Sequence, residues 1–300
     1  MKDKHKYNTS QLFNFAQDSY FERTSRPIYA LVFLLPFIIF YELGTIFINT
    51  DVLNQSQVRV VAFLWLKEFL EHLGFGSKLA WVAPPLAVVI ILAALQLSSR
   101  KRWRFWAGDL WPMAAECIVL AVPLIVLSLF LNSSSGAGGE MGGSYQSAMR
   151  AEVGGLTSCS SVAVSGLSEV AGGGAEGESL LANIVTGIGA GIYEELIFRL
   201  ILICVLMLLL QDVLRLSRRS SIIVAVLVSA ALFSGHHHIV FLGGRFGLSA
   251  PFSWTEFIFR TMAGVYFAVL FAVRGFGITA GTHAFYDIIA TVVNTVFFQQ

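Results

Sequence analysis

The sequence predicts an all-α membrane protein, a polytopic bundle of about seven transmembrane helices in which the C-terminal four carry the polar chemistry. The first observation is composition: 56% of the 300 residues are hydrophobic and 13% are charged, whereas soluble domains contain about 25% charged residues. The second is a series of long apolar runs. The third is that basic residues cluster in alternate connections between those runs.

Seven stretches of the chain approach the length of about 20 mostly apolar residues that a helix needs to cross a bilayer. The expected spans are residues 27–48, 79–97, 106–131, 180–210, 221–240, 255–273 and 275–297. The first stretch is too long and too far from the N-terminus for a cleaved signal peptide, so we expect it to remain as an anchor.

The connections indicate an orientation, because cytoplasmic loops are enriched in Lys and Arg. Basic residues occur in the N-terminal segment, in SSRKRWRF after the second span, in QDVLRLSRRS after the fourth and at Arg274 after the sixth. The remaining connections contain few. We therefore expect a cytoplasmic N-terminus. The net charge of +1 and the lack of a concentrated basic surface exclude nucleic acid as a partner.

Two segments lie outside the expected spans. Residues 57–73 (QVRVVAFLWLKEFLEHL) place apolar residues at helical spacing among charged ones, which is typical of an interfacial helix on the outer surface; a short re-entrant segment is the alternative. Residues 132–178 are rich in Gly and Ser, and we expect a flexible extracytoplasmic loop. This loop would separate an N-terminal membrane region, residues 1–131, from a C-terminal membrane core, residues 179–300.

Ionisable side chains inside membrane spans cost about 2.5 to 3.5 kcal/mol each on insertion scales and therefore mark function by default. The fourth, fifth and seventh spans each contain a polar set, respectively in EELIFR, FSGHHHIV and THAFYD. Their members are Glu194, Glu195 and Arg199, then His236, His237 and His238, and finally His283 and Asp287. At about 1.5 Å of rise per residue, the sets lie at similar depth. We expect them to share one cavity.

Helical geometry separates the two adjacent glutamates. Glu195 and Arg199 are four residues apart on one face and can form an ion pair. Glu194 is rotated by about 100° from Glu195 and has no partner on its own helix. A carboxylate in a partly dry cavity suits general-base work on a water molecule. The glycines at 187, 189 and 191 would let a neighbouring helix come close.

Each polar set also has a structural alternative. A buried Glu–Arg pair can fix helix packing, a His triplet can be a solvated helix end, and a His and an Asp four residues apart are common in any helix. Three sets at one depth favour a functional site. They match, in order, the motifs EExxxR (Glu194 to Arg199), FxxxH (Phe233 to His237) and HxxxN/D (His283 to Asp287).

This ordered trio, within roughly residues 180–297, resembles the CPBP family (CAAX protease and bacteriocin-processing), also called Abi, which includes CAAX prenyl endopeptidases and many bacterial membrane proteins. The resemblance implies an intramembrane endopeptidase that hydrolyses a peptide bond near the cytoplasmic face, in the inner (cell) membrane of a bacterium. The C-terminal four helices would be its catalytic core. The implied partners are the bilayer and a peptide or lipidated-protein substrate.

The resemblance also implies catalytic roles for six residues. Glu194 would activate the hydrolytic water and His237 would help to hold it, while Glu195 and Arg199 would support the site. His283 and Asp287 would face the scissile carbonyl as its oxyanion forms. The prenyl endopeptidases have Asn at the last position, and an ionised Asp cannot donate a hydrogen bond. Our hypothesis is that Asp287 orients and charges His283.

No cofactor is expected, and a metal-free glutamate mechanism is favoured because no HExxH motif is present. The alternative is a zinc site formed by Glu194, His237 and His283, with three protein ligands and an open position. A competing function is a non-catalytic peptide-binding or bacteriocin-immunity protein in the membrane. A proton-coupled transporter is less consistent with the sequence, because it predicts polar sites in both halves of the chain.

Overall fold

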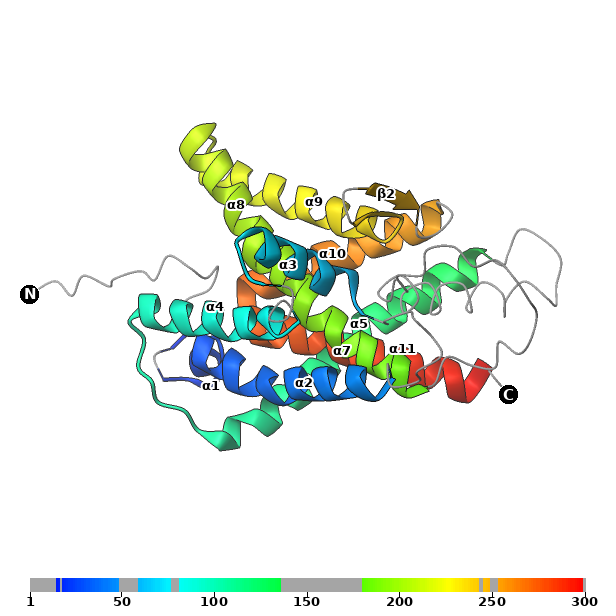
Figure 1. Ribbon diagram of the computed structural model, residues 1–300, viewed down its shortest axis with the longest axis horizontal. Coiled ribbons are helices and arrows are strands. Elements are labelled where there is room, and N and C mark those ends of the chain that lie inside the picture. Colours follow the sequence, from blue (N-terminus) through cyan, green and yellow to red (C-terminus); the bar gives the residue numbers. More distant parts are fainter. Residues whose placement is uncertain are drawn as a thin grey trace, which may run out of the picture.

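A computed structural model gives the structure of the chain, and it describes residues 15–16, 18–48, 59–76, 81–135, 180–242, 245–248 and 253–298. Helices dominate these residues (Figure 1). The α-helices are α1 (Tyr20–Thr24), α2 (Pro27–Ile48), α3 (Val61–His72), α4 (Ala83–Ser99), α5 (Leu110–Ser135), α7 (Leu180–Glu195), α8 (Ile203–Leu208), α9 (Arg218–His236), α10 (Trp254–Arg274) and α11 (Phe276–Phe298). The other elements are a 3₁₀ turn, η1 (Ala107–Asp109), two π-helical segments, η3 (Leu196–Leu202) and η4 (Leu209–Val213), and two strands, β1 (Ile239–Leu242) and β2 (Arg245–Leu248).

The expected polytopic helical bundle is confirmed. Among the described residues, six helices are long and apolar enough to cross a membrane: α2, α5 with η1, the continuous helix from α7 to η4, α9, α10 and α11. The second expected span, residues 79–97, corresponds to α4, an apolar helix of only 17 residues. That length is at the lower limit for a crossing. The helix count is therefore close to the seven expected.

Two expected spans end at different residues from those predicted. The span over residues 221–240 ends four residues earlier, because α9 stops at His236 and the chain turns into an antiparallel hairpin that pairs Ile239 with Leu248. In contrast, α5 continues to Ser135, four residues into the expected loop at 132–178. The rest of that loop lies outside the described residues, so the division into two membrane regions stays a prediction.

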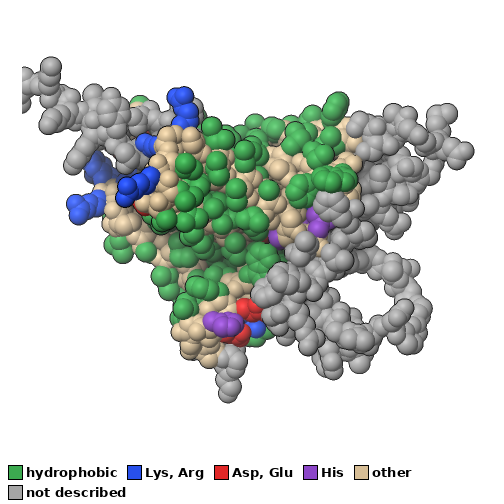
Figure 2. All heavy atoms as spheres, turned by 90° about the horizontal axis from the view of Figure 1, so that it is seen from above, with side chains coloured by type: hydrophobic (Ala, Val, Ile, Leu, Met, Phe, Trp, Pro, Cys, Tyr) green, Lys and Arg blue, Asp and Glu red, His purple; other side chains and the backbone are tan. Residues whose placement is uncertain are grey.

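The basic connections lie toward one end of the bundle. In Figure 1 the segment after α4, the connection between η4 and α9 and the turn between α10 and α11 all lie toward the end that carries α1. Figure 2 shows one face on which apolar side chains cover the middle and most of the visible Lys and Arg side chains gather at one end. This arrangement is consistent with the expected alternation of the spans.

Helices α7 and α11 form the centre of the bundle. Helix α7 packs against α11 and α2. Of the candidate spans, α11 is the most enclosed, with 67% of its most apolar stretch buried. Two of the expected glycine positions make this contact possible. A Cβ at Gly191 would lie 2.6 Å from the backbone nitrogen of Ala284, and a Cβ at Gly187 would lie 2.6 Å from the Cβ of Asp287. The two helices that carry carboxylates at the site can therefore approach closely.

Helix α3 corresponds to the amphipathic segment expected over residues 57–73. One face of it is buried and packs against α4 and α7. Its N-terminal end is held by Arg59, whose Nη1 lies 2.9 Å from Oε2 of Glu42. The hydroxyl of Tyr193 donates a hydrogen bond to the other oxygen of Glu42, at 3.2 Å. The N-terminal region is thus joined to the residue that directly precedes Glu194.

Adding one methyl group at Gly191 tests how closely α7 and α11 approach each other. Gly191→Ala should lower the melting temperature of the purified protein, with a cost of about 1–3 kcal/mol, because the new Cβ would overlap backbone atoms of Ala280 and Ala284. Gly235→Ala is the matched control, since a Cβ there meets no atom within 4 Å. Equal melting temperatures for the two variants in the same detergent would contradict this packing.

Candidate active site

The two adjacent glutamates are the last residues of α7, where the helix changes geometry. Glu194 is 1% exposed and Glu195 is fully buried. Regular α-helix continues through the glycines and ends at Glu195, and the π-helical segment η3 begins at Leu196. Short π-helical segments within α-helices occur frequently at functional sites. The change of helical pitch falls between the acidic pair and Arg199.

Glu195 and Arg199 form the ion pair expected from their spacing. Oε2 of Glu195 lies 3.1 Å from Nε of Arg199, and both side chains are fully buried. Nη2 of Arg199 also donates a hydrogen bond to the carbonyl of Gly264 in α10, at 3.3 Å. The guanidinium lies over the ring of Phe233, 4.1 Å from its centroid, which is a favourable cation–π position. Arg199 therefore ties η3 to both α9 and α10.

His283 extends this charged cluster to α11. Its Nδ1 lies 2.8 Å from Oε1 of Glu195, and its Nε2 lies 3.6 Å from Oδ2 of Asp287. The ring stacks on Phe267 at a centroid distance of 4.5 Å. Both ring nitrogens face carboxylates, an arrangement that suits an imidazolium with two donors. Arg199, Glu195, His283 and Asp287 thus form a buried line of alternating charge, which we call the charged line.

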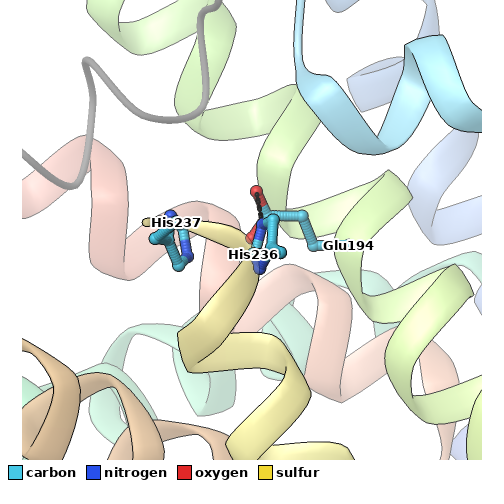
Figure 3. Close-up of side chains that lie close together, drawn as sticks. All are labelled: Glu194, His236 and His237. Carbon is cyan, nitrogen blue, oxygen red and sulfur yellow. Dashed lines mark ion pairs between the residues drawn. The ribbon is translucent and has the colours of Figure 1, made fainter. Parts of the chain in front are cut away.

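Glu194 lies apart from the charged line and faces the end of α9. Its Oε1 is 3.5 Å from Nε2 of His236 (Figure 3). This separation is an ion-pair contact but exceeds the usual hydrogen-bond length. Among the described residues, neither carboxylate oxygen of Glu194 accepts a hydrogen bond. The two glutamates therefore differ in geometry: Glu195 accepts a hydrogen bond from His283 and forms an ion pair with Arg199 at 3.1 Å, whereas Glu194 has the longer ion-pair contact with His236.

His236 is the residue at the site that sequence reasoning did not select. Its Nδ1 is hydrogen-bonded to the carbonyl oxygen of Phe233, one turn earlier in α9. Its ring contacts Phe198 at a centroid distance of 4.8 Å and Trp65 of α3 at 5.7 Å. The sequence signal was the triplet HHH, in which the FxxxH spacing points to His237. The position of the helix end decides which imidazole meets Glu194.

His237 completes a compact group of three. One ligand atom from each of Glu194, His236 and His237 lies within 4.8 Å of the others, and all three residues are buried. This is the group among the described residues that could hold a metal ion. It differs from the zinc set that the sequence offered as an alternative, because it contains His236 in place of His283. His283 instead faces the carboxylates of Glu195 and Asp287.

One known protein family matches the part of the chain that contains this site. Residues 176–289 match the family model described as type II CAAX prenyl endopeptidase Rce1-like. The match covers every residue of the three motifs. The predicted resemblance to CPBP proteins is confirmed over this region. No curated protein and no solved structure matches the chain.

The match and the fold both bear on the class of the protein. Six helices are long and apolar enough to cross a membrane, and the matched region begins before α7 and ends within α11. The chain is an integral membrane protein, and at the family level the match supports a CAAX-type intramembrane protease. Helices α2 to α5 lie outside the matched region.

The ion pair at the centre of the site should be essential to stability. Arg199→Gln leaves Glu195 buried beside His283 without its guanidinium, and we expect a loss of about 3–5 kcal/mol. Lys67→Gln is the control, because Lys67 and Glu71 have the same i,i+4 spacing at 3.3 Å but are partly exposed. That loss should stay below about 1 kcal/mol. Thermal melting of both variants in one detergent measures the difference, and similar losses would contradict this account.

Proposed function

We propose that the chain is an intramembrane endopeptidase in which Glu194 activates the hydrolytic water. The observation that supports this role most directly is the contrast within the acidic pair. Glu195 is engaged by Arg199 and His283, whereas Glu194 is equally buried, accepts no hydrogen bond and lies beside two histidines. A buried carboxylate that needs a partner is well suited to bind a water molecule and to take its proton.

In the proposed reaction, a water molecule is held between Glu194 and the imidazole of His237. Glu194 takes one proton from the water as the water oxygen attacks the scissile carbonyl carbon. The resulting tetrahedral intermediate carries its negative charge on the former carbonyl oxygen. Glu194 then delivers its proton to the leaving amine nitrogen as the C–N bond breaks. The products are a carboxylic acid and an amine, and Glu194 is regenerated.

His283 is proposed to stabilise the oxyanion. It is held by Glu195 on Nδ1, while its Nε2 lies 3.6 Å from Asp287, too far for a strong hydrogen bond. A protonated Nε2 can therefore turn its donor toward a developing oxyanion, where preorganised donors contribute most to catalysis. Asp287 would supply the charge that keeps the imidazole protonated.

The proposed substrate is a peptide segment that reaches the bilayer, either lipidated or intrinsically apolar. The name of the matched family refers to CAAX prenyl endopeptidases, so a prenylated C-terminal peptide is the first candidate. The site residues are buried among apolar helices, which favours a substrate that can partition into the membrane. Cleavage near the cytoplasmic face follows from the orientation that the basic connections predict.

Glu194→Gln tests the proposed function. The variant keeps the size of the side chain but cannot act as a base, and we expect cleavage of prenylated CAAX peptides in proteoliposomes to fall by about 10²- to 10⁴-fold. Glu71→Gln is a matched control, because Glu71 is a partly exposed residue of α3 whose ion-pair partner, Lys67, is also partly exposed. Activity of wild type that survives strong chelation would support the metal-free mechanism.

Two results would contradict the proposal. Undiminished cleavage by Glu194→Gln would remove Glu194 from the role of base. Tight binding of the peptides without cleavage by wild type would favour the non-catalytic alternative, a membrane protein that binds or sequesters peptides.

The role proposed for Asp287 has its own test. Asp287→Asn removes the charge beside His283 while preserving the volume of the side chain, so we expect kcat to fall and the alkaline side of the pH–rate profile to move to lower pH, because the imidazolium then loses its proton more readily. Asp212→Asn, in the π-helical segment η4, is the control. Unchanged or higher turnover of Asp287→Asn would show that the charge is not required.

A further inference from the structure

We propose that Glu194, His236 and His237 form a binding site for a divalent transition metal of the zinc class, and that the metal, when bound, inhibits the peptidase. The group is distinct from the alternative zinc set of the sequence analysis, because it contains His236 and not His283. Metal binding by these residues does not depend on the proposed function. Only the inhibition rests on it.

The first support is the distance between Glu194 and His236. Oε1 and Nε2 lie 3.5 Å apart, which is longer than a usual hydrogen bond. Two ligand atoms that each lie about 2.1 Å from a tetrahedral metal are separated by about 3.4 Å. The spacing of this pair of atoms is therefore close to the edge of a tetrahedral site. Figure 3 shows the carboxylate and the imidazole directed toward each other from α7 and α9.

The second support is the orientation of His236. A carbonyl oxygen can only accept, so the bond between Nδ1 and the Phe233 carbonyl requires the proton to be on Nδ1. The neutral ring then presents the lone pair of Nε2 to Glu194. Histidines that bind metals commonly donate their other ring N–H to a backbone carbonyl in this way, which fixes both tautomer and orientation.

The third support is that the carboxylate of Glu194 and Nε2 of His236 are both hydrogen-bond acceptors, and no donor of the described residues lies between them. In the described part of the chain, both carboxylate oxygens of Glu194 and Nε2 of His236 lack a hydrogen-bond partner. Both residues are nevertheless at least 95% buried. Buried polar atoms without partners are costly. A cation placed between them would satisfy the carboxylate and the imidazole together.

His237 supplies the third ligand atom. Its ring centroid lies 4.0 Å from that of His236, and its ligand atom is within 4.8 Å of the other two. Three protein ligands with a fourth position left open are typical of zinc sites that can exchange water or a substrate. His238, the last member of the triplet, does not belong to the group.

Inhibition follows from the use of the same carboxylate. A metal bound through Oε1 of Glu194 occupies the lone pairs that would otherwise take a proton from water. In a metal-free peptidase the bound cation therefore blocks the base. The polar contacts of His236 are with Glu194 and the carbonyl of Phe233, outside the charged line. Removal of His236 should therefore weaken metal binding and leave the arrangement of the charged line in place.

The test uses the full chain, purified in detergent and stripped with a chelator. The visible absorption of Co²⁺ and the amount of Zn²⁺ retained after dialysis measure binding without any requirement for activity. We expect about one metal per chain and a tetrahedral Co²⁺ spectrum in wild type. His236→Ala and the volume-preserving His236→Gln should both weaken binding by at least about 10- to 100-fold.

Three control variants separate this site from the alternatives. His238→Ala tests the triplet as a whole, and His72→Ala tests binding at an exposed histidine. Both should keep the affinity of wild type. His283→Gln should also retain it, whereas the set Glu194, His237 and His283 requires its loss. Melting curves confirm that each variant is folded.

The outcomes are distinct for the metal site and for the proposed function. No stoichiometric metal in folded wild type, or binding that survives in both His236 variants, would overturn the site. If the site is present, Zn²⁺ should inhibit cleavage by wild type, and a higher concentration should be needed for His236→Gln. If a chelator abolishes cleavage, the metal is needed for activity. This result would be compatible with the metal site, but it would overturn both the inhibitory role of the metal and the metal-free mechanism.

Discussion

The structure depends on the cost of burying charge in an apolar bundle. The four residues of the charged line are at most 5% exposed, and each charge lies beside an opposite charge that offsets the cost of burying it. Since these residues come from the end of α7, from η3 and from α11, the charged line fixes how those helices meet. The close contact at Gly191 and Gly187 is the steric counterpart of that requirement. Packing and electrostatics therefore specify the same arrangement.

Glu194 and Glu195 are adjacent and chemically identical, but they have different environments. Glu195 contacts His283 of α11 and Arg199, whereas Glu194 faces His236 at the end of α9. A rotation of about 100° between successive residues accounts for the difference. Glu195 therefore contributes to stability, and Glu194 stays available for chemistry. Helix α3, from outside the family match, contacts this second environment through Trp65.

Local spacing predicted much of this arrangement. The pair Glu195 and Arg199, the separate position of Glu194 and the close approach at the glycines all follow from helical periodicity, and the structure has each of them. His236 could not be predicted, because its role depends on α9 ending at that residue. Neither could the π-helical segment or the buried face of α3, since both are set by contacts between elements distant in sequence.

The central claim is that the two glutamates divide stability and chemistry between them. The most direct measurement is a side-by-side comparison of Glu194→Gln and Glu195→Gln in the same bilayer, with melting temperature and cleavage rate recorded for each. The account predicts that Glu194→Gln melts close to wild type and is inactive, whereas Glu195→Gln melts at a clearly lower temperature because Arg199 loses its partner. Equal destabilisation by both variants, or cleavage that survives in Glu194→Gln, would contradict it.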